Sequence, residues 1–245
     1  MPRMLIEPGQ NTYTMILYLN GDSHGAGAEA VNTFCFAEDD GKYLGLGRQP
    51  HPDNLAVSYG KVLADRLGAT LQCDAESASS NDRVIRTTKE YLTKHTPELI
   101  IIGWSSWERE EWLYEGQYWQ VNASGAGLDW PTAVQEQHRH WVLTVDYNEK
   151  IKQAHNAIWE FHKELANIPH LFFNCFSAYK WVPHYDWGDN YVGPYDNQLS
   201  YREWLLVNGF KTVNSNSYHF GPDAHSAWAN FLYQNYIQNR LTNNT

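Results

Sequence analysis

The apolar run at residues 99–102, Leu-Ile-Ile-Ile followed by Gly103, restricts the fold of this chain more than any other stretch. Its side chains do not alternate with polar ones, as they would in a strand with one face in water. A continuous run of β-branched residues is typical of a parallel strand that is covered on both faces. We therefore expect a parallel sheet between two layers of helices.

Other segments extend this pattern of short apolar strands that alternate with helices. Apolar runs predict strands at residues 15–20, 69–73 and 170–176, and a short last strand at 210–213. Helical spacing and capping residues predict helices at 26–33, 58–67, 82–95, 148–168, 201–207 and 222–241. The aromatic-rich segments 104–147 and 177–198 are expected to be loops. This order indicates an α/β fold, a three-layer α/β/α sandwich with a central parallel sheet.

Length and charge limit the domain count and the partners. The chain has 245 residues, 42% of them hydrophobic, which suffices for one large domain at residues 15–245, with residues 1–14 as a flexible extension. A net charge of −10 argues against a nucleic-acid partner or an anionic membrane surface. We also find no signal-peptide core and no bilayer-spanning segment, so we expect a protein of the cytoplasm with no membrane partner.

The residue pattern favours neither a metal nor a cofactor. Cys35, Cys73 and Cys175 show no disulfide framework and no zinc-ligand spacing, and the last two are expected to be buried thiols. His138 and His140 have the spacing of a ligand pair, but no carboxylate or cysteine partner is evident nearby. We therefore expect no bound metal and no cofactor.

The first predicted strand ends in a small polar turn, Asn20-Gly21-Asp22-Ser23-His24. In parallel sheets, functional residues collect at the carboxyl ends of the strands. Ser23 would lie near free backbone N–H groups that favour negative charge, which is what a serine nucleophile and its oxyanion need. His24 either contacts the substrate or is an ordinary surface histidine of the turn.

Four short blocks in a fixed order resemble the SGNH, or GDSL-like, hydrolase superfamily. They are Gly21-Asp22-Ser23, the loop at 76–83, Gly103-Trp104-Ser105-Ser106, and His219 followed by His225 and Ala229. The resemblance covers about residues 15–235 and implies a flavodoxin-like SGNH hydrolase fold. It further implies a serine esterase in which Ser23 is the nucleophile and His219 is the base.

The resemblance also implies an oxyanion hole that begins with the N–H of Ser23. Ala78 takes the place of the family's glycine, and its N–H can donate if the backbone does not need a positive φ. Ser105 takes the place of the family's asparagine, and a hydroxyl reaches less far than an amide. Asn81, in the neighbouring loop, is a candidate to compensate.

The catalytic acid is the most serious departure from the family. Asn216 stands three residues before His219, where the family has the aspartate that orients the histidine and stabilises the imidazolium. Asp223 is a possible substitute, but an acid in the first turn of a helix is better explained by the helix dipole. A backbone carbonyl that orients His219 instead would leave a Ser–His dyad.

The aromatic loops and the breadth of the family favour a small acyl ester of a carbohydrate as substrate. Trp104, Trp181 and Trp187 are candidates to stack on a sugar ring, although packing of the loops explains them equally well. Arg109 either grips a substrate carboxylate or sulfate or belongs to a solvated helix start at residues 108–111.

Two functions remain open at this stage. One is an esterase that works through a Ser–His dyad or a degenerate triad. The other is a non-catalytic module that binds glycan or serves in an assembly such as a virus particle. The stretches at 80–83 and 107–110 are also similar to proteins of marine phages and bacteria, which adds a virion-associated location to the expectations.

Overall fold

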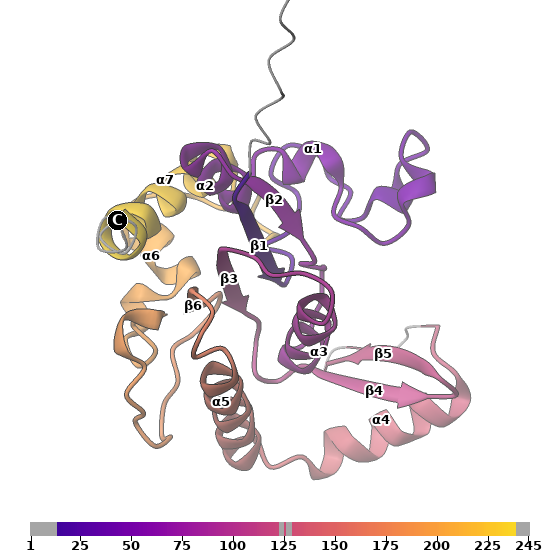
Figure 1. The fold of residues 1–245 in the computed structure, drawn as a ribbon. Helices are drawn as coiled ribbons and strands as arrows, with labels where there is room; N and C mark the ends of the chain where they lie inside the picture. Colours follow the sequence, from indigo (N-terminus) through magenta and orange to yellow (C-terminus); the bar gives the residue numbers. More distant parts are fainter. Residues whose placement is uncertain (1–13, 123–124, 126–128, 239–245) are drawn as a thin grey trace, which may run out of the picture.

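The computed structural model describes residues 14–122, 125 and 129–238, and a five-stranded parallel sheet forms its centre (Figure 1). The strands are β1 (Ile16–Gly21), β2 (Thr70–Cys73), β3 (Leu99–Trp104), β6 (His170–Asn174) and β7 (Tyr191–Val192). Their order is β2-β1-β3-β6-β7, and every neighbouring pair is parallel. This is the flavodoxin-like order. In such sheets, ligands bind at the carboxyl ends of β1 and β3, the neighbouring strands at which the strand order reverses. The extension expected at residues 1–14 lies outside the described residues, apart from Thr14.

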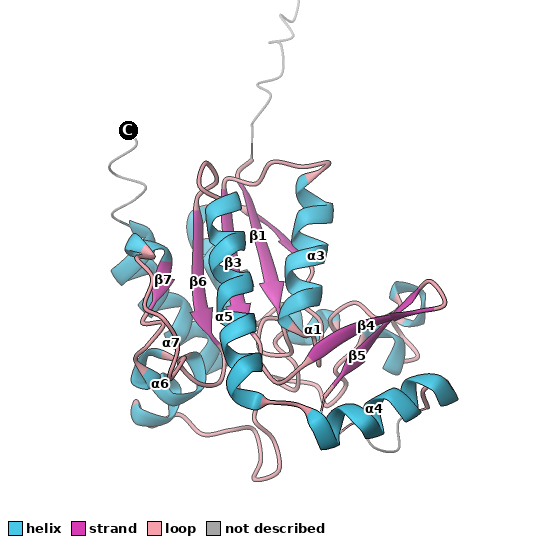
Figure 2. Cartoon of the chain, turned by 90° about the horizontal axis from the view of Figure 1, so that it is seen from below, coloured by secondary structure: helices cyan, strands magenta, loops and turns pink. Residues whose placement is uncertain are grey.

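Helices cover both faces of the sheet, so the predicted α/β/α sandwich is confirmed. Helices α2 (Tyr59–Leu67), α6 (Tyr201–Val207) and α7 (Pro222–Leu232) pack on one face. Helices α3 (Asn81–Leu92) and α5 (Tyr147–Glu164) lie across the other (Figure 2). Short helical segments complete the described part: α1 (Pro52–Leu55), Ala37–Asp39, Leu44–Leu46, Gly188–Asn190, Asn197–Leu199 and the π-helical turn Tyr233–Ile237 that continues α7.

Strand β3 explains why its sequence is apolar without alternation. Ile101 belongs to the core under α2 and α7, whereas Ile100 and Ile102 belong to the core under α3 and α5. All three are fully buried. Each face of the strand therefore removes apolar surface from water, which is the main favourable contribution to folding.

The glycines that end β1 and β3 allow these strands to approach closely. Gly21 pairs with Gly103, and a Cβ placed on Gly21 would lie 2.6 Å from the Gly103 carbonyl oxygen. A Cβ on Gly103 would lie 2.8 Å from the sulfur of Cys175. A side chain at Gly21 would push β1 away from β3, and one at Gly103 would clash with Cys175 and Phe173. The motif glycines thus have a packing role.

The segment 104–147 is not a loop throughout, which corrects the sequence prediction. It holds an antiparallel hairpin, β4 (Glu110–Tyr114) and β5 (Gln117–Val121), and helix α4 (Thr132–Thr144), which project from the body of the domain (Figure 1). Val121, Trp130 and Val134 form its core, with other tryptophans packed around them. The helix start expected at 108–111 is also wrong, because Glu110 and Glu111 open β4.

Three smaller predictions also differ from the structure. Residues 26–33 form successive turns, because Gly27 and Glu29 both take positive φ values, 67° and 61°. The strand expected at 210–213 is reduced to a single bridge between Thr212 and Phe220. The loop expected at 177–198 contains the edge strand β7.

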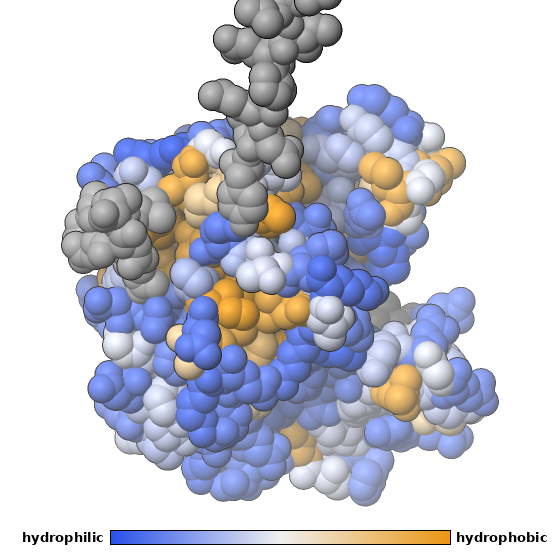
Figure 3. Space-filling model, in the orientation of Figure 1, coloured by the Kyte–Doolittle hydropathy of each residue, from blue (hydrophilic) through white to orange (hydrophobic). Residues whose placement is uncertain are grey.

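The face shown in Figure 3 is largely hydrophilic, with apolar colour confined to smaller patches. Across the residues that the structure describes, no helix combines the length and the apolar character needed to cross a membrane.

Candidate active site

A cavity of about 910 Å³ opens beside the carboxyl ends of β1, β3 and β6. It brings together seven residues that the sequence analysis proposed for the site: Ser23, His24, Ala78, Ser105, Arg109, Trp181 and His219. Asn81, Trp104, Trp187 and Asn216 do not line it. The first and last blocks of the chain, almost 200 residues apart in sequence, therefore face the same space.

Ser23 lies in the turn that follows β1 and is 6% exposed. The turn is closed by hydrogen bonds from Ala26 N to Asp22 O at 3.1 Å and from Ala28 N to Ser23 O at 2.9 Å. Within the described ranges, neither Ser23 nor Ala78 uses its backbone N–H in a hydrogen bond. Both N–H groups are therefore available to an oxyanion in the cavity.

The carboxylate that contacts His219 belongs to Glu29, and residue 216 does not provide this contact. Its Nδ1 lies 2.6 Å from Glu29 Oε2, and the hydroxyl of Ser217 donates to the same oxygen. Ser217 Oγ in turn accepts from the His219 N–H at 2.9 Å. Among the described residues, Asn216 hydrogen-bonds through its backbone N–H, to Asn214 Oδ1, and its side chain does not take the place of the carboxylate expected beside His219.

The pKa values of this pair suit a general base. Burial alone would raise the pKa of Glu29, but hydrogen bonds from His219 and Ser217 outweigh it and lower the pKa. Burial, followed by the nearby His24, lowers the pKa of His219 against the opposing effect of Glu29. At neutral pH, His219 is therefore uncharged and donates its Nδ1–H to the Glu29 carboxylate, which leaves Nε2 free to accept a proton.

These directions predict the pH profile of any reaction that His219 serves as base. Activity requires the neutral ring, so kcat/KM should rise through the His219 pKa and reach its plateau by neutral pH. Because that pKa is lowered, we expect the midpoint below about 6.5. The profile of kcat/KM between pH 4.5 and 8 measures it, and a midpoint above 7 would contradict the assignment.

Glu29 was not identified from the sequence, although one signal points to it. It is the single charged residue in the small-residue segment Gly25-Ala26-Gly27-Ala28-Glu29-Ala30. Its φ of 61° is rare for a residue with a side chain, and such strain is often retained at functional sites. The left-handed conformation takes the chain out of the Ser23 turn and carries the carboxylate to His219.

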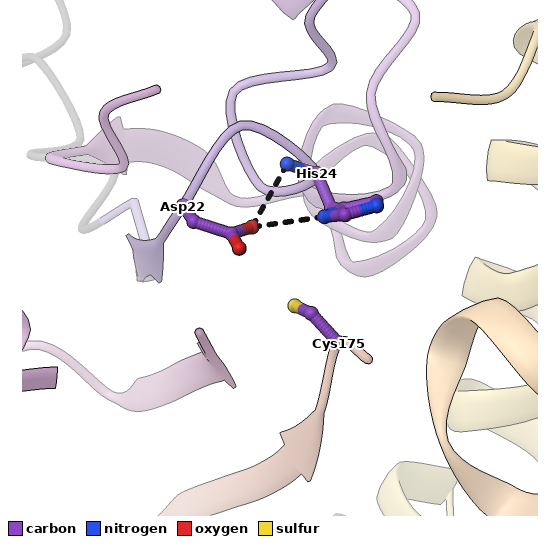
Figure 4. Close-up of side chains that lie close together, drawn as sticks. All are labelled: Asp22, His24 and Cys175. Atoms are coloured by element: carbon purple, nitrogen blue, oxygen red, sulfur yellow. Dashed lines mark hydrogen bonds and ion pairs between the residues drawn. The ribbon is translucent and has the colours of Figure 1, made fainter. Parts of the chain in front are cut away.

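A second buried network anchors the Ser23 turn (Figure 4). Asp22 Oδ1 accepts from the backbone N–H of His24 and lies 3.0 Å from its Nδ1. His24 is 2% exposed, so it is not the surface histidine that one interpretation expected. Burial opposes ionisation of Asp22, but His24 and Arg109 outweigh it and hold the pKa at about 2.

Cys175 completes this network, and its chemistry fits a metal poorly. Metal-ligating atoms of Asp22, His24 and Cys175 lie within 4.8 Å of one another. However, burial and then the charge of Asp22 raise the pKa of the Cys175 thiol, and Arg109 already lies 3.4 Å from Asp22. A protonated thiol and a neighbouring guanidinium both oppose a bound cation.

The second oxyanion block is strained in this chain. Ala78 has a φ of 68°, so the backbone does need a positive φ at this position, and the condition stated for an alanine here is not met. An L-residue in this region costs roughly 1–2 kcal/mol, and glycine does not bear that cost. Ala78 lines the cavity, and its N–H has no hydrogen-bond partner among the residues that the structure describes.

Ala78→Gly should therefore stabilise the protein. Relief of the backbone strain outweighs the extra freedom of glycine in the unfolded chain, so we expect the free energy of unfolding to rise by about 0.5–1 kcal/mol. Urea denaturation of the two proteins measures this difference. A lower free energy of unfolding in the variant would contradict the interpretation.

The third block is held by side-chain hydrogen bonds. Asn81 Oδ1 accepts from the Ser105 N–H at 2.9 Å, and Asn81 Nδ2 donates to the Ser105 carbonyl at 3.4 Å. Asn81 is thus committed to the backbone of Ser105, which corrects its expected role as a compensating oxyanion donor. The Ser105 hydroxyl accepts from Arg109 Nη1 at 2.8 Å.

The aromatic residues near the cavity divide sharply by exposure. Trp104 and Trp187 are 0% and 4% exposed and belong to the core between the sheet and α5, so neither offers a face to a substrate. The expectation that they bind substrate is wrong. Trp181 lines the cavity and is 89% exposed, with a φ of 61°.

Comparison with known proteins gives fold neighbours only. No protein-family profile and no curated protein matches the chain. Among solved structures, the chain is similar to the acetyl xylan esterase Est2A of Butyrivibrio proteoclasticus, at 12% identity and a TM-score of 0.46, over 96% of this chain and 66% of that one.

Two further solved structures are similar at the same low level. A family-two carbohydrate esterase of Clostridium thermocellum is 14% identical, with a TM-score of 0.47, over 98% of this chain and 68% of that one. The esterase EstA of Pseudoalteromonas sp. is 11% identical, with a TM-score of 0.40, over 93% and 98%. The chain spans about two thirds of the length of the first two proteins. Similarity this low leaves the function to be argued from the site itself.

Proposed function

We propose that this protein is a serine hydrolase of the SGNH type that cleaves carboxylic esters. The observation that carries the proposal is the Glu29–His219 pair, joined at 2.6 Å, whose histidine lines the same cavity as Ser23. A serine near a histidine that a carboxylate orients is the arrangement that activates a hydroxyl for nucleophilic attack.

The proposed reaction has two halves. Ser23 Oγ attacks the ester carbonyl while His219 Nε2 takes its proton, and Glu29 stabilises the imidazolium that results. The N–H groups of Ser23 and Ala78 donate to the oxyanion. His219 then returns the proton to the leaving alkoxide, and a water molecule, deprotonated by His219, releases the acyl group from Ser23.

We propose a small acyl ester of a carbohydrate as the substrate class. Trp181 supports this choice, because an exposed indole at the mouth of the cavity offers a flat apolar face to a sugar ring. Asn148 also lines the cavity and provides a polar group for a hydroxyl. The ester itself would lie deeper, beside Ser23.

Rates on a panel of acetyl esters test this proposal. The wild type should hydrolyse both 4-nitrophenyl acetate and acetylated xylo-oligosaccharides. Trp181→Ala should raise KM for the oligosaccharides by about tenfold, equivalent to one lost stacking contact, and leave 4-nitrophenyl acetate unaffected. Tyr118→Ala is the control, because it removes an exposed aromatic side chain from the hairpin, away from the residues that line the cavity. Trp159→Ala is unsuitable, because Trp159 packs against the core.

The same panel separates the esterase from a non-catalytic module. Binding of xylo-oligosaccharide without hydrolysis of any acetyl ester would favour a glycan-binding module and reject the esterase. Hydrolysis with equal KM values in the wild type and in Trp181→Ala would retain the esterase and reject the carbohydrate subsite.

A further inference from the structure

The side chain of Arg109 meets all three blocks that surround the proposed oxyanion. Its Nη1 lies 2.8 Å from Ser105 Oγ in the third block and 3.4 Å from Asp22 Oδ2 in the first. It also donates to the carbonyl of Ser79 in the second block at 3.4 Å. One nitrogen therefore marks the point where the segments after β1, β2 and β3 converge.

The surrounding chain holds this guanidinium in place. Asp22 is fully buried and provides the balancing negative charge, and the Phe176 ring lies 5.3 Å from the Arg109 carbon Cζ. The Arg109 N–H donates to Ser106 O at 3.2 Å, which fixes the turn between β3 and β4. The side chain is 20% exposed and lines the cavity with Ser23.

The guanidinium still has donors to offer. Its three hydrogen bonds all involve Nη1, and within the described part of the chain neither Nε nor Nη2 has a partner. Neither atom is among the buried polar atoms without a partner, so both are accessible. A planar cation with accessible N–H groups is suited to an oxygen that becomes negatively charged.

We infer that Arg109 is a catalytic residue of the proposed hydrolase, and that it donates to the oxyanion in place of the amide that Ser105 lacks. In this arrangement Ser105 positions the guanidinium rather than donating itself. The inference rests on the proposed function, because an oxyanion forms only if Ser23 attacks a carbonyl.

This role differs measurably from recognition of an anionic substrate. An oxyanion exists only in the transition state and the intermediate, so loss of its donor lowers kcat and leaves KM nearly unchanged. A substrate carboxylate is bound in the ground state as well, so loss of its partner raises KM for anionic substrates alone. A neutral and an anionic ester of the same alcohol distinguish the two.

The experiment measures kcat and KM of the full chain on 4-nitrophenyl acetate and 4-nitrophenyl hemisuccinate. Arg109→Met should lower kcat on both esters by about 10²- to 10³-fold, with KM changed less than threefold. The kcat of Arg109→Lys should be at least tenfold higher than that of Arg109→Met. Lys180→Met, which removes another cation from the cavity wall, should leave kcat on the neutral ester unchanged.

A rescue variant separates catalysis from a structural role. Ser105→Asn in the Arg109→Met background restores the family's amide and should raise kcat at least tenfold. If Arg109→Met does not fold, Arg109→Lys alone decides, with a drop of about tenfold in kcat expected at constant KM.

The remaining results overturn either the inference about Arg109 or the proposed function. An active wild type with unchanged kcat in Arg109→Met, or in Arg109→Lys if the former is unfolded, overturns the inference. An increase of KM confined to the hemisuccinate also overturns it and assigns Arg109 to substrate recognition. A wild type that hydrolyses neither ester and is not labelled at Ser23 overturns the proposed function instead.

Discussion

Ser23→Ala should lower kcat/KM for acetyl ester hydrolysis by about 10⁴- to 10⁶-fold. Removal of the nucleophile from a serine hydrolase abolishes the covalent route and leaves only the residual catalysis of the oxyanion hole and binding. Here the residual site would consist of the backbone N–H groups of residues 23 and 78 and of the Arg109 guanidinium. Steady-state hydrolysis of 4-nitrophenyl acetate measures the loss.

Ser106→Ala is the matched control for this variant. Ser106 lines the same cavity, and across the described residues the hydrogen bond of its hydroxyl is a long one, accepted from the Glu108 N–H at 3.4 Å. We expect its kcat/KM to stay within about threefold of the wild type. Equal activity in Ser23→Ala and the wild type would reject Ser23 as the nucleophile.

Glu29→Gln should lower kcat by about 10²- to 10⁴-fold. Glutamine keeps the shape of the side chain and a hydrogen-bonding oxygen but cannot stabilise the imidazolium of His219, and the corresponding change costs about 10⁴ in a serine protease. The Glu29 and His219 side chains are 28% and 18% exposed, so solvent provides part of that stabilisation and extends the expected range downward. Turnover of 4-nitrophenyl acetate at pH 7.5 measures it.

The same substitution should also shift the pH profile. Glu29 raises the pKa of His219 against the effects of burial and of His24. Its neutralisation should therefore move the acid limb of kcat/KM to lower pH. An unchanged rate and an unchanged limb would show that Glu29 does not act on His219.

Asn216→Ala tests whether Glu29 or residue 216, the position that the sequence spacing suggests, is the partner of His219. Asn216 makes its hydrogen bond through the backbone and is exposed, so its side chain should be dispensable. We expect kcat within about twofold of the wild type. A loss as large as that in Glu29→Gln would return the third catalytic position to residue 216.

The fold was predictable where local patterns and global packing agree. The unbroken apolar run of β3 implies helices on both faces, and both core clusters include its isoleucines. Ser80 accepts from the Arg83 N–H at the start of α3, and Gly68 ends α2 with a φ of 63°, as the capping pattern predicts. Local hydrogen bonding determines these ends, so a few residues suffice to identify them.

The hairpin and α4 were missed because their core is tertiary. Trp112 pairs with Trp119 across the hairpin, and Trp141 of α4 packs against Trp112 with ring centroids 5.9 Å apart. Read along the sequence, these tryptophans show no single period, since they come from two strands and a helix. Only their contact with one another reveals a small core.

The site was predictable to the extent that its residues follow strand ends or keep a fixed spacing. Ser23 follows β1, and the six-residue spacing to His225 identified His219. Ser23 and His219 both line the cavity. Glu29 contacts His219 across a sequence separation of 190 residues, and its position depends on a positive φ that glutamate rarely adopts. No spacing rule covers such a contact.

The central proposal is that Ser23 is a nucleophile, that His219 takes its proton, and that Glu29 orients His219. Its most direct test is the second-order rate constant for phosphonylation of Ser23 by a fluorophosphonate, with the labelled peptide identified by mass. The wild type and Asn216→Ala should be labelled on Ser23 at equal rates, and Glu29→Gln at least about 100-fold more slowly. Absence of label on wild-type Ser23, under conditions that label a control esterase, would contradict the account, as would equal rates in all three proteins.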